Sequence, residues 1–238
     1  MRLAPCVISP SSMARVLECP RKAKLSENIN DTQAFPIGMH VGNIVHAAIT
    51  GHKYEQPSRL AMDKITPTMR DAKIQAQFMI DRAEDFLANY KIIDKEVPVA
   101  REIDAWSDTW RVEGTIDLIL ERYQDGLTIL CDLKTGYRRP SGVWPQLSAY
   151  AFAHGRLLNA NEPNGTLIRR CAVLWVPRRR YRLNDVMPEW EERDFEHVYF
   201  AGQDMASATA VGLSLAHTVP SQQACASCTV EDCAVRWW

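Results

Sequence analysis

Hydrophobic and polar residues alternate along two consecutive stretches in the middle of the chain. Apolar side chains fill most alternate positions over residues 110–121 and again over 127–134, which is the period of a strand with one covered face. Between them, residues 123–126 (Tyr-Gln-Asp-Gly) carry turn-forming residues. The pattern predicts a β-hairpin, with Asp117 on the polar face of its first strand and Asp132 and Lys134 on that of its second.

This hairpin brings two carboxylates together. With a four-residue loop, Asp117 lies opposite Asp132, and directly opposed side chains have Cβ atoms roughly 5 Å apart. Such carboxylates repel each other unless one is protonated or a cation binds both, and oxygen ligands favour Mg²⁺ or Mn²⁺. Lys134 lies on the same face, so the site could neutralise a phosphodiester during hydrolysis. A strand end and a surface ion pair would explain either motif alone.

Helical periodicity surrounds the hairpin and predicts an α/β fold. Helices are expected over about residues 11–26, 38–51, 68–90, 143–158 and 201–217, and strands over about 96–106, 109–122, 127–134 and 171–176. We expect a central mixed sheet flanked by helices in a single domain, 1–238. Its parts would be an N-terminal helical part (1–92), a catalytic α/β core (93–184) and a C-terminal helix with a cysteine cluster (185–238).

Four cysteines near the two ends of the chain could bind a second metal centre. They are Cys19, Cys225, Cys228 and Cys233. Four thiolates suit zinc and iron–sulfur clusters equally well, so the spacing does not choose between them. Unliganded thiols would explain so tight a C-terminal cluster poorly. Cys131 and Cys171 lie on apolar strand faces and are expected to be buried.

Composition limits the compartment and the partners. The seven cysteines are an odd number and no signal peptide precedes them, so we expect a reducing cytoplasm and no disulfide framework. No apolar run is long enough to cross a membrane. The formal net charge is −1, so binding to DNA would require local basic patches. The candidate contacts are Arg138, Arg139, Arg178 and Arg179, with a solvated surface as the alternative; Arg138 and Arg139 are the best of them because they closely follow Lys134.

Four short motifs occur in an order that resembles the RecB-like branch of the PD-(D/E)XK nuclease superfamily. They are Gly42-x3-His46, Gly114-x2-Asp117, Asp132-x-Lys134 and Gln146-x3-Tyr150. One N-terminal and three C-terminal cysteines also resemble the arrangement around the four-iron four-sulfur (4Fe-4S) cluster of CRISPR adaptation exonucleases, the AddB nuclease domain and phage-encoded relatives. Without these motifs, His46 in its apolar helix would be assigned to the core, as would Tyr150.

The resemblance implies a restriction-endonuclease-like core and a deoxyribonuclease dependent on Mg²⁺ or Mn²⁺, most simply an exonuclease acting on single-stranded DNA ends. It makes His46, Asp117, Asp132 and the backbone carbonyl of Leu133 metal ligands, Lys134 the catalytic lysine, and Gln146 and Tyr150 residues that support the site. It also implies a 4Fe-4S cluster on the four cysteines, acting as a clasp between the ends of the chain, with zinc as the alternative.

Two other classes of function stay open at this point. One is a catalytically inactive DNA-binding or recombination accessory protein with the same fold. The other is a zinc-stapled interaction protein whose hairpin carboxylates are surface groups. The expected partners are DNA and recombination or CRISPR adaptation proteins, with no membrane, in the cytoplasm of a bacterial, archaeal or phage-infected cell. Whether the chain forms oligomers is not specified by the sequence.

Overall fold

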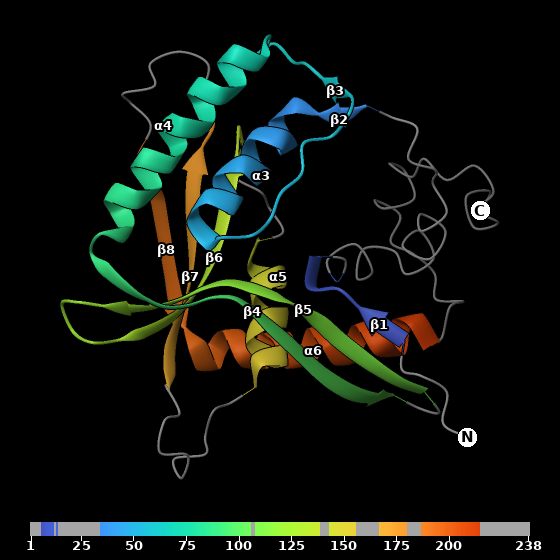
Figure 1. Ribbon diagram of the computed structural model, residues 1–238. Coiled ribbons are helices and arrows are strands. Elements are labelled where there is room, and N and C mark those ends of the chain that lie inside the picture. Colours follow the sequence, from blue (N-terminus) through green and yellow to red (C-terminus); the bar gives the residue numbers. More distant parts are fainter. Residues whose placement is uncertain are drawn as a thin grey trace.

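The computed structural model describes residues 6–11, 13, 34–105, 108–138, 143–155, 167–179 and 187–214. Within them a mixed six-stranded sheet lies between two pairs of helices, as an α/β fold (Figure 1). Its strands are β1 (Cys6–Ile8), β4 (Tyr90–Ala105), β5 (Asp108–Arg122), β6 (Thr128–Gly136), β7 (Ile168–Pro177) and β8 (Glu189–Asp194). The order is β1-β5-β6-β7-β8, and β4 pairs with β5.

The expected hairpin is confirmed as β5 and β6. These strands are antiparallel, with Leu118 opposite Cys131 and Glu121 opposite Thr128. The turn closes where Arg122 N donates to Leu127 O at 3.0 Å and Gly126 N donates to Arg122 O at 2.8 Å. Gly126 has a φ of 67°, a conformation that glycine adopts without steric cost. The turn residues predicted from the sequence therefore set the register.

Strand β6 leaves β5 shortly after the turn. The two strands pair only from Leu118–Cys131 to the turn, whereas β6 pairs with β7 in parallel along its whole length, from Thr128 to Gly136. Short β1 pairs with β5 further along, at residues 110–112. Residues 113–117 of β5 thus lie between β1 and β6, which opens the sheet where the polar residues of β5 and β6 face each other.

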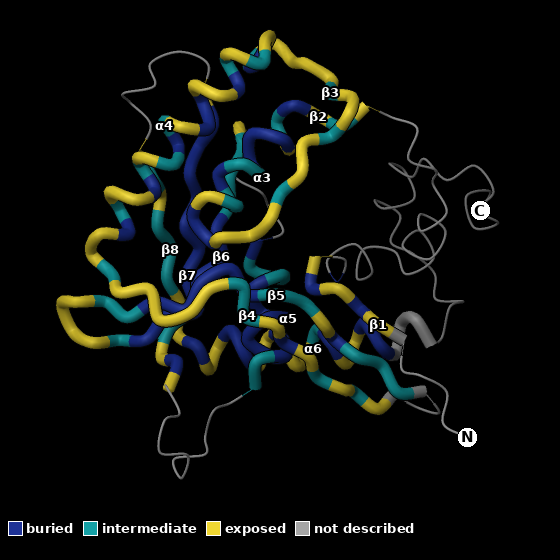
Figure 2. Tube along the Cα trace, viewed as in Figure 1, coloured by how far each residue is buried: buried dark blue, intermediate teal, exposed yellow. Residues whose placement is uncertain are grey.

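Helices α3 (Ile37–Thr50) and α4 (Met69–Leu87) cover one face of the sheet. Their apolar side chains share a core with the centre of β6 and β7, which is buried throughout (Figure 2). Helix α4 begins after Thr68, whose hydroxyl accepts from Asp71 N at 3.1 Å. Helix α3 ends at Gly51, which has a φ of 83°, and Lys95 Nζ donates to Ile49 O at 2.6 Å. A two-stranded sheet of β2 (Phe35–Pro36) and β3 (Leu60–Ala61) flanks them.

Helices α5 (Val143–His154) and α6 (Phe195–Ser214) cover the other face. They pack very closely against each other, because a Cβ atom at Gly202 would lie 1.9 Å from the backbone oxygen of Ser148. The apolar residues of α5 form a second core with β4, β5 and α6. Both faces of β5 are therefore covered near its C-terminal end: Leu118 packs toward α3 and α4, and Ile119 belongs to the core of α5 and α6. A strictly one-sided apolar pattern is wrong for this part of the strand.

Several predicted boundaries need correction. Strand β4 begins at Tyr90, where the sequence predicted the end of a helix. Helix α5 ends at His154 rather than residue 158, because Gly155 adopts a φ of 82° and its N–H bonds to Ala151 O at 3.2 Å. Helix α6 begins at Phe195 rather than 201. Of the helix predicted over 11–26, most lies outside the described residues.

An acidic stretch beginning at Glu189, for which the sequence predicts no strand, is ordered against the sheet. It forms the edge strand β8, antiparallel to β7. Its side chains pair with basic and indole groups nearby, as when Arg122 Nη1 lies 2.9 Å from Glu192 Oε2 and Trp144 Nε1 donates to Glu191 Oε1 at 2.7 Å. Among the described helices, none is both long and apolar enough to cross a membrane.

Candidate active site

Three carboxylates from three adjacent strands lie in one row across the sheet. Asp117 is one residue past the Leu118–Cys131 pair, so the register places it opposite Asp132 of β6. On the other edge of β5, the pairs Lys95–Leu118 and Val97–Ile116 place it opposite Glu96 of β4. Asp117 is 7% exposed and Asp132 is 1% exposed. Acidic groups so close and so buried need positive charge between them.

The departure of β6 from β5 shapes this row. After Cys131 the backbone of β6 no longer pairs with β5, and the N–H of Leu133 donates instead to Asp117 Oδ2 at 2.6 Å. A buried N–H without a partner would cost about 1–3 kcal/mol, so the carboxylate replaces a missing strand bond. Asp117 is held in place by the same bond, with its second oxygen left for other partners.

Helix α3 contributes His46 to the row. Its Nε2 lies 2.9 Å from Asp117 Oδ1, and its Nδ1 lies 3.7 Å from Glu96 Oε1. Burial lowers the pKa of His46, but the Asp117 and Glu96 carboxylates more than offset this, so the pKa is raised. The two carboxylates therefore favour the protonated form of the imidazole that lies between them. A divalent cation at the same place would displace that proton.

Lys134 supplies the second positive charge. Its Nζ lies 2.8 Å from both oxygens of the Asp132 carboxylate. Burial lowers the pKa of Lys134, yet Asp132 and Asp117 raise it by more, so the ammonium stays charged. Burial raises the pKa of Asp132 to about 6, although Lys134 partly counteracts the rise. The Asp132 carboxyl thus titrates near neutral pH.

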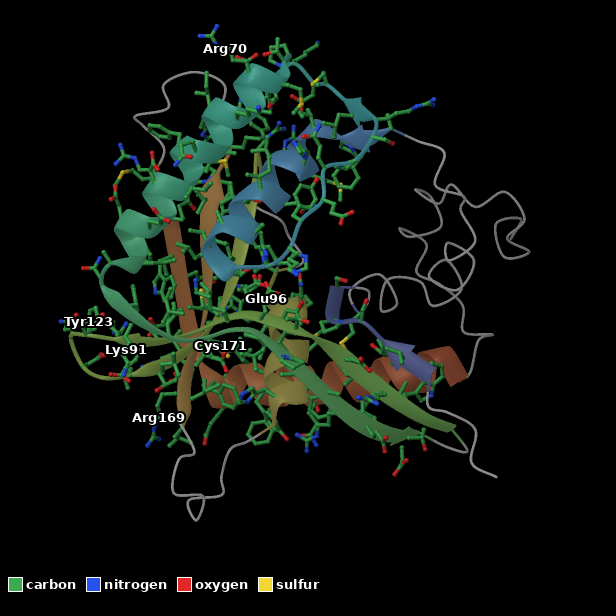
Figure 3. The ribbon with its side chains drawn as sticks, viewed as in Figure 1. Arg70, Lys91, Glu96, Tyr123, Arg169 and Cys171 are labelled. Carbon is green, nitrogen blue, oxygen red and sulfur yellow. The ribbon has the colours of Figure 1, made fainter. Side chains whose placement is uncertain are left out.

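Glu96 completes the acidic row from β4 (Figure 3). It has a φ of 50° and is the non-glycine residue with a positive φ in the described part of the chain. Its Oε1 is buried and has no hydrogen-bond partner among the described residues. His52, after the end of α3, lies 3.7 Å from the other oxygen, Oε2. A buried carboxylate oxygen without a partner is costly unless a cation or a water binds there.

The donor set fits a hard divalent cation. One donor atom each from His46, Glu96 and Asp117 lies within 4.8 Å of the other two, and the Asp132 carboxylate follows next in the row. One imidazole nitrogen with carboxylate oxygens suits Mg²⁺ or Mn²⁺. Such an ion would bind the buried Glu96 Oε1, which accepts no hydrogen bond among the described residues, and would neutralise the negative charge of the buried carboxylates.

Gln146 and Tyr150 lie one helical turn apart on α5, as predicted. Gln146 Nε2 donates to the Tyr150 hydroxyl at 3.0 Å. Burial raises the pKa of Tyr150 to about 12, so its hydroxyl is neutral. A Cβ atom at Gly114 would lie 2.8 Å from the ring of Tyr150. The glycine of the Gly114-x2-Asp117 motif therefore lets the tyrosine approach β5 beside the carboxylates.

The glycine that precedes His46 has a similar role. A Cβ atom at Gly42 would lie 2.5 Å from Thr135 Oγ1. Thr135 follows Lys134 on β6, so the absent side chain lets α3 approach the end of that strand. Because His46 is one turn further along α3, this close approach brings its imidazole to Asp117.

The predicted DNA contacts have different environments. Arg138 and Arg179 are exposed, whereas Arg139 lies outside the described residues. Arg178 is only 6% exposed, and its guanidinium binds Thr66 Oγ1 at 2.7 Å and Asp63 Oδ2 at 2.8 Å. Its prediction as a DNA contact is therefore corrected, because it joins β7 to the loop that precedes α4.

The remaining predicted residues divide between the described and undescribed parts. Leu133 reaches the site through its N–H, and the role of its carbonyl stays a prediction. Cys19, Cys225, Cys228 and Cys233 all lie outside the described residues. Cys131 and Cys171 are buried free thiols, which confirms their assignment to the core.

Sequence reasoning missed Glu96, although the signal was present. Strands β4 and β5 are joined with Ala105 opposite Asp108, and this tight connection fixes their register. Counting back from this pair along both strands places Glu96 opposite Asp117, in the same way that counting from the turn places Asp132 opposite Asp117. What the sequence does not signal is the positive φ, which aims the side chain into the row.

Comparisons with known proteins give two distant structural likenesses and one family model that matches. The crystal structure of SSO0001 has a TM-score of 0.32 and 10% identity, and the match covers 91% of this chain and 93% of that one. The protein named "Putative exonuclease" from Eubacterium rectale has a TM-score of 0.43 and 14% identity, covering 87% and 82%. A search among curated proteins finds no match. The family model described as PD-(D/E)XK nuclease superfamily matches residues 7–236, nearly the whole sequence. The chain therefore belongs to the PD-(D/E)XK nuclease superfamily.

Proposed function

We propose that the protein is a Mg²⁺- or Mn²⁺-dependent deoxyribonuclease that hydrolyses phosphodiesters at the acidic row. The observation that carries this proposal is the alignment of Glu96, Asp117 and Asp132 across three strands, with His46 and Lys134 beside them. A cation would stabilise these three carboxylates, because they lie close together and are largely removed from solvent. A bound divalent ion would supply Lewis acidity toward the phosphate and a nucleophilic water.

Several residues of the row would coordinate the ion together. His46, Asp117 and Asp132 offer side-chain donors, and we add Glu96 to the predicted set because its buried Oε1 accepts no hydrogen bond among the described residues and lies among them. The bond from Leu133 N orients Asp117 and would turn one carboxylate oxygen toward the ion. The Leu133 carbonyl stays in the proposed ligand set.

Lys134 acts as a fixed positive charge in this proposal. Its pKa is raised by Asp132 and Asp117, after burial has lowered it, so it holds its proton and does not act as a general base. A compact ammonium can orient the attacking water and neutralise charge that develops on the phosphate. Tyr150, neutral at physiological pH and supported by Gln146, would hold the DNA backbone or Lys134 in place.

The mode of attack is proposed to be exonucleolytic, on single-stranded ends. The support is the resemblance of the four motifs to RecB-like nucleases. Arg138 and Arg179 are exposed and are the proposed phosphate contacts, together with Arg139. Recombination and CRISPR adaptation proteins are the proposed partners.

Cleavage of end-labelled DNA tests the function. We expect degradation of single-stranded DNA with Mg²⁺ or Mn²⁺ and none with EDTA, and a loss of at least 100-fold in Lys134→Ala and Asp132→Ala, because each removes a charge that stabilises the transition state. Lys73→Ala, on the exposed face of α4, is the matched control and should cleave like wild type.

Three results would separate the alternatives. A circular single-stranded substrate should resist an exonuclease and would be cut by an endonuclease. Cleavage that persists undiminished in Lys134→Ala and Asp132→Ala would contradict the assigned site. Tight DNA binding without cleavage by any form of the protein would favour the inactive accessory protein.

We also propose that Cys19, Cys225, Cys228 and Cys233 bind a 4Fe-4S cluster that joins the two ends of the chain. The support is the cysteine arrangement and its resemblance to cluster-containing relatives. Linking residues so far apart removes loop entropy from the unfolded chain, about 4–5 kcal/mol in the simplest estimate.

Iron and sulfide analysis of anaerobically purified protein tests the cluster. We expect about four of each per chain and an absorbance near that of iron–sulfur proteins, both lost in Cys228→Ser, with Cys171→Ser retaining them because Cys171 is buried in the core. One zinc per chain without iron would contradict the cluster and leave a zinc clasp.

A further inference from the structure

We propose that a groove beside Lys134 holds one unpaired base of the DNA strand, stacked on Tyr137. This inference rests on the proposed nuclease function and names a part of its substrate: the nucleotide next to the scissile phosphate, in single-stranded form. The groove has a volume of about 430 Å³, within the range of sites that enclose small ligands. Its lining includes Met39, Asn43, Asp63, Thr135, Tyr137 and Arg178.

Several residues that line the groove are neighbours, in the sequence, of residues in the acidic row. Thr135 and Gly136 directly follow Lys134 at the end of β6, and Tyr137 is the next residue. At about 3.3 Å per residue, Tyr137 lies within roughly 10 Å of Lys134 along the chain. On the opposite wall, Gly42 precedes His46 by one turn of α3. The nucleotide next to a phosphate bound at the row is therefore within reach of the groove.

Two exposed side chains at the groove suit a flat, aromatic ligand. Tyr137 is 48% exposed and Met39 is 56% exposed, so both side chains are accessible to a ligand in the groove. A tyrosine ring stacks on any base, because every base has a π-face. Methionine adapts to different shapes. Together they favour a base held without sequence selection.

The floor of the groove is fixed and nearly neutral. Arg178 is buried and its Nη2 lies 2.8 Å from Asp63 Oδ2, so the acid at the groove is compensated. A Cβ atom at Gly38 would lie 2.8 Å from this guanidinium, so α3 approaches Arg178 only because residue 38 is glycine. Helix α3 has no acidic residue in its first turn. Nothing among the described lining residues therefore repels the phosphate that accompanies the base.

A base in a duplex is stacked and paired, so it could not enter this groove. The structure therefore favours single-stranded DNA over double-stranded DNA as the form that is bound. Of the two polymers, DNA is the one we propose, and RNA is an outcome that the test distinguishes.

Binding of a short single-stranded oligonucleotide that contains 2-aminopurine tests the proposal. The full-length protein is titrated in Ca²⁺, and affinity and fluorescence quenching are read without any cleavage. We expect Tyr137→Ala to raise the Kd at least fivefold and to lose most of the quenching, because one stacked base is removed. Tyr137→Phe should restore both readouts, since it keeps the ring.

Tyr123→Ala is the matched control. Tyr123 is also an exposed tyrosine, at 66%, and it lies in the turn before β6 (Figure 3). Tyr137 follows the other end of that strand. The Tyr123→Ala variant should bind the oligonucleotide with the same Kd and quenching as wild type. Both tyrosines are exposed, so melting temperatures should match and exclude a folding defect.

The outcomes separate this inference from the function on which it rests. Wild-type affinity and quenching in Tyr137→Ala would overturn the stacking site even if the protein cleaves DNA. A protein that never cleaves DNA, but binds it with Tyr137-dependent quenching, would overturn the nuclease function and support the groove. Tighter, Tyr137-dependent binding of the matching RNA would overturn DNA as the ligand.

Discussion

Glu96 combines backbone strain with a position among buried acids. Its φ of 50° lies in the left-handed region, which costs roughly 1–2 kcal/mol for a residue with a Cβ atom. The strand around it is irregular, with a register shift between Ile92 and Asp94. Together the irregularity and the positive φ turn the carboxylate toward His46 and Asp117, where a bound cation would offset the strain.

Two substitutions at Glu96 should separate the energetic cost of its positive φ from the contribution of its carboxylate to metal binding. Both Glu96→Ala and Glu96→Gly remove the carboxylate, but only glycine adopts a positive φ without steric cost. We expect the glycine variant to be about 1 kcal/mol more stable than the alanine variant in chemical denaturation without divalent ions. Both should lose much of the stabilisation by Mn²⁺.

The exposed strand residue Ala100 provides the control for Glu96. There alanine should be more stable than glycine, because glycine weakens an ordinary strand. If the Glu96 pair also favours alanine, the strain at Glu96 does not exist in solution.

Asp132 predicts a stability that depends on pH. Burial raises its pKa in the folded protein to about 6, against 3.8 for an ordinary aspartate. The folded state therefore binds the proton more tightly, and this group's contribution to stability falls as the pH rises from about 4 to 6. Above pH 6 the folded protein holds a buried negative charge at full cost.

Asp132→Asn should therefore be more stable than wild type at pH 8 without divalent ions, on the order of 1–3 kcal/mol. The difference should shrink at pH 4.5, and Mn²⁺ should reverse the ranking at pH 8 because only wild type gains from binding. Thermal melts at both pH values measure this, with the exposed Asp204→Asn as control. A variant less stable than wild type at pH 8 without metal would contradict the assignment.

Asp117, Asp132 and Lys134 could be predicted because strand periodicity and turn length fix which residues oppose each other. Their proximity is a consequence of register alone. The bond from Leu133 N to Asp117 Oδ2 could not be predicted, because it depends on β6 leaving β5 after Cys131. That departure follows from the parallel pairing with β7, a contact between segments distant in sequence.

At the scale of elements, the contact between α5 and α6 positions one wall of the site. Gly202 of α6 lies against the backbone of Ser148, between Gln146 and Tyr150 of α5. A side chain at residue 202 cannot be accommodated by a rotamer change, because the atom in its way is a backbone oxygen. The separation of these helices, and hence the depth of Tyr150, depends on that glycine.

Gly202→Ala should destabilise the protein by about 2–3 kcal/mol, since the helices must separate. This outweighs the gain of roughly 1 kcal/mol that alanine gives within a helix. Denaturant unfolding measures the change, and the exposed neighbour Gln203→Ala should stay within about 0.5 kcal/mol of wild type. An alanine variant as stable as wild type would show that the two helices are further apart in solution.

Elements with strong local periodicity were predicted well, and those decided by tertiary contacts were not. Helix α3 differs by one residue at each end from the predicted 38–51. The sequence predicts no strand at β8, because four of its six residues are acidic and it lacks an alternating apolar pattern. In the structure the strand is stabilised by partners elsewhere, such as Arg122 and Trp144, which no local pattern reveals.

At the scale of the whole molecule, charge is organised locally rather than globally. A net charge of −1 gives no overall attraction to DNA. The buried acids of the row would repel a phosphate, and the Lys134 ammonium is the positive charge next to them, joined by His46 when its imidazole is protonated. In this account the bound cation both brings the phosphate to the site and stabilises the folded protein.

The most direct test of this account is anomalous diffraction from crystals grown with Mn²⁺. The account predicts manganese density within coordination distance of the Asp117 and Asp132 carboxylates, and its loss in Asp132→Ala crystals. Crystals saturated with Mn²⁺ that show no manganese at the row, or show it only elsewhere, would contradict the claim that these carboxylates form a metal site.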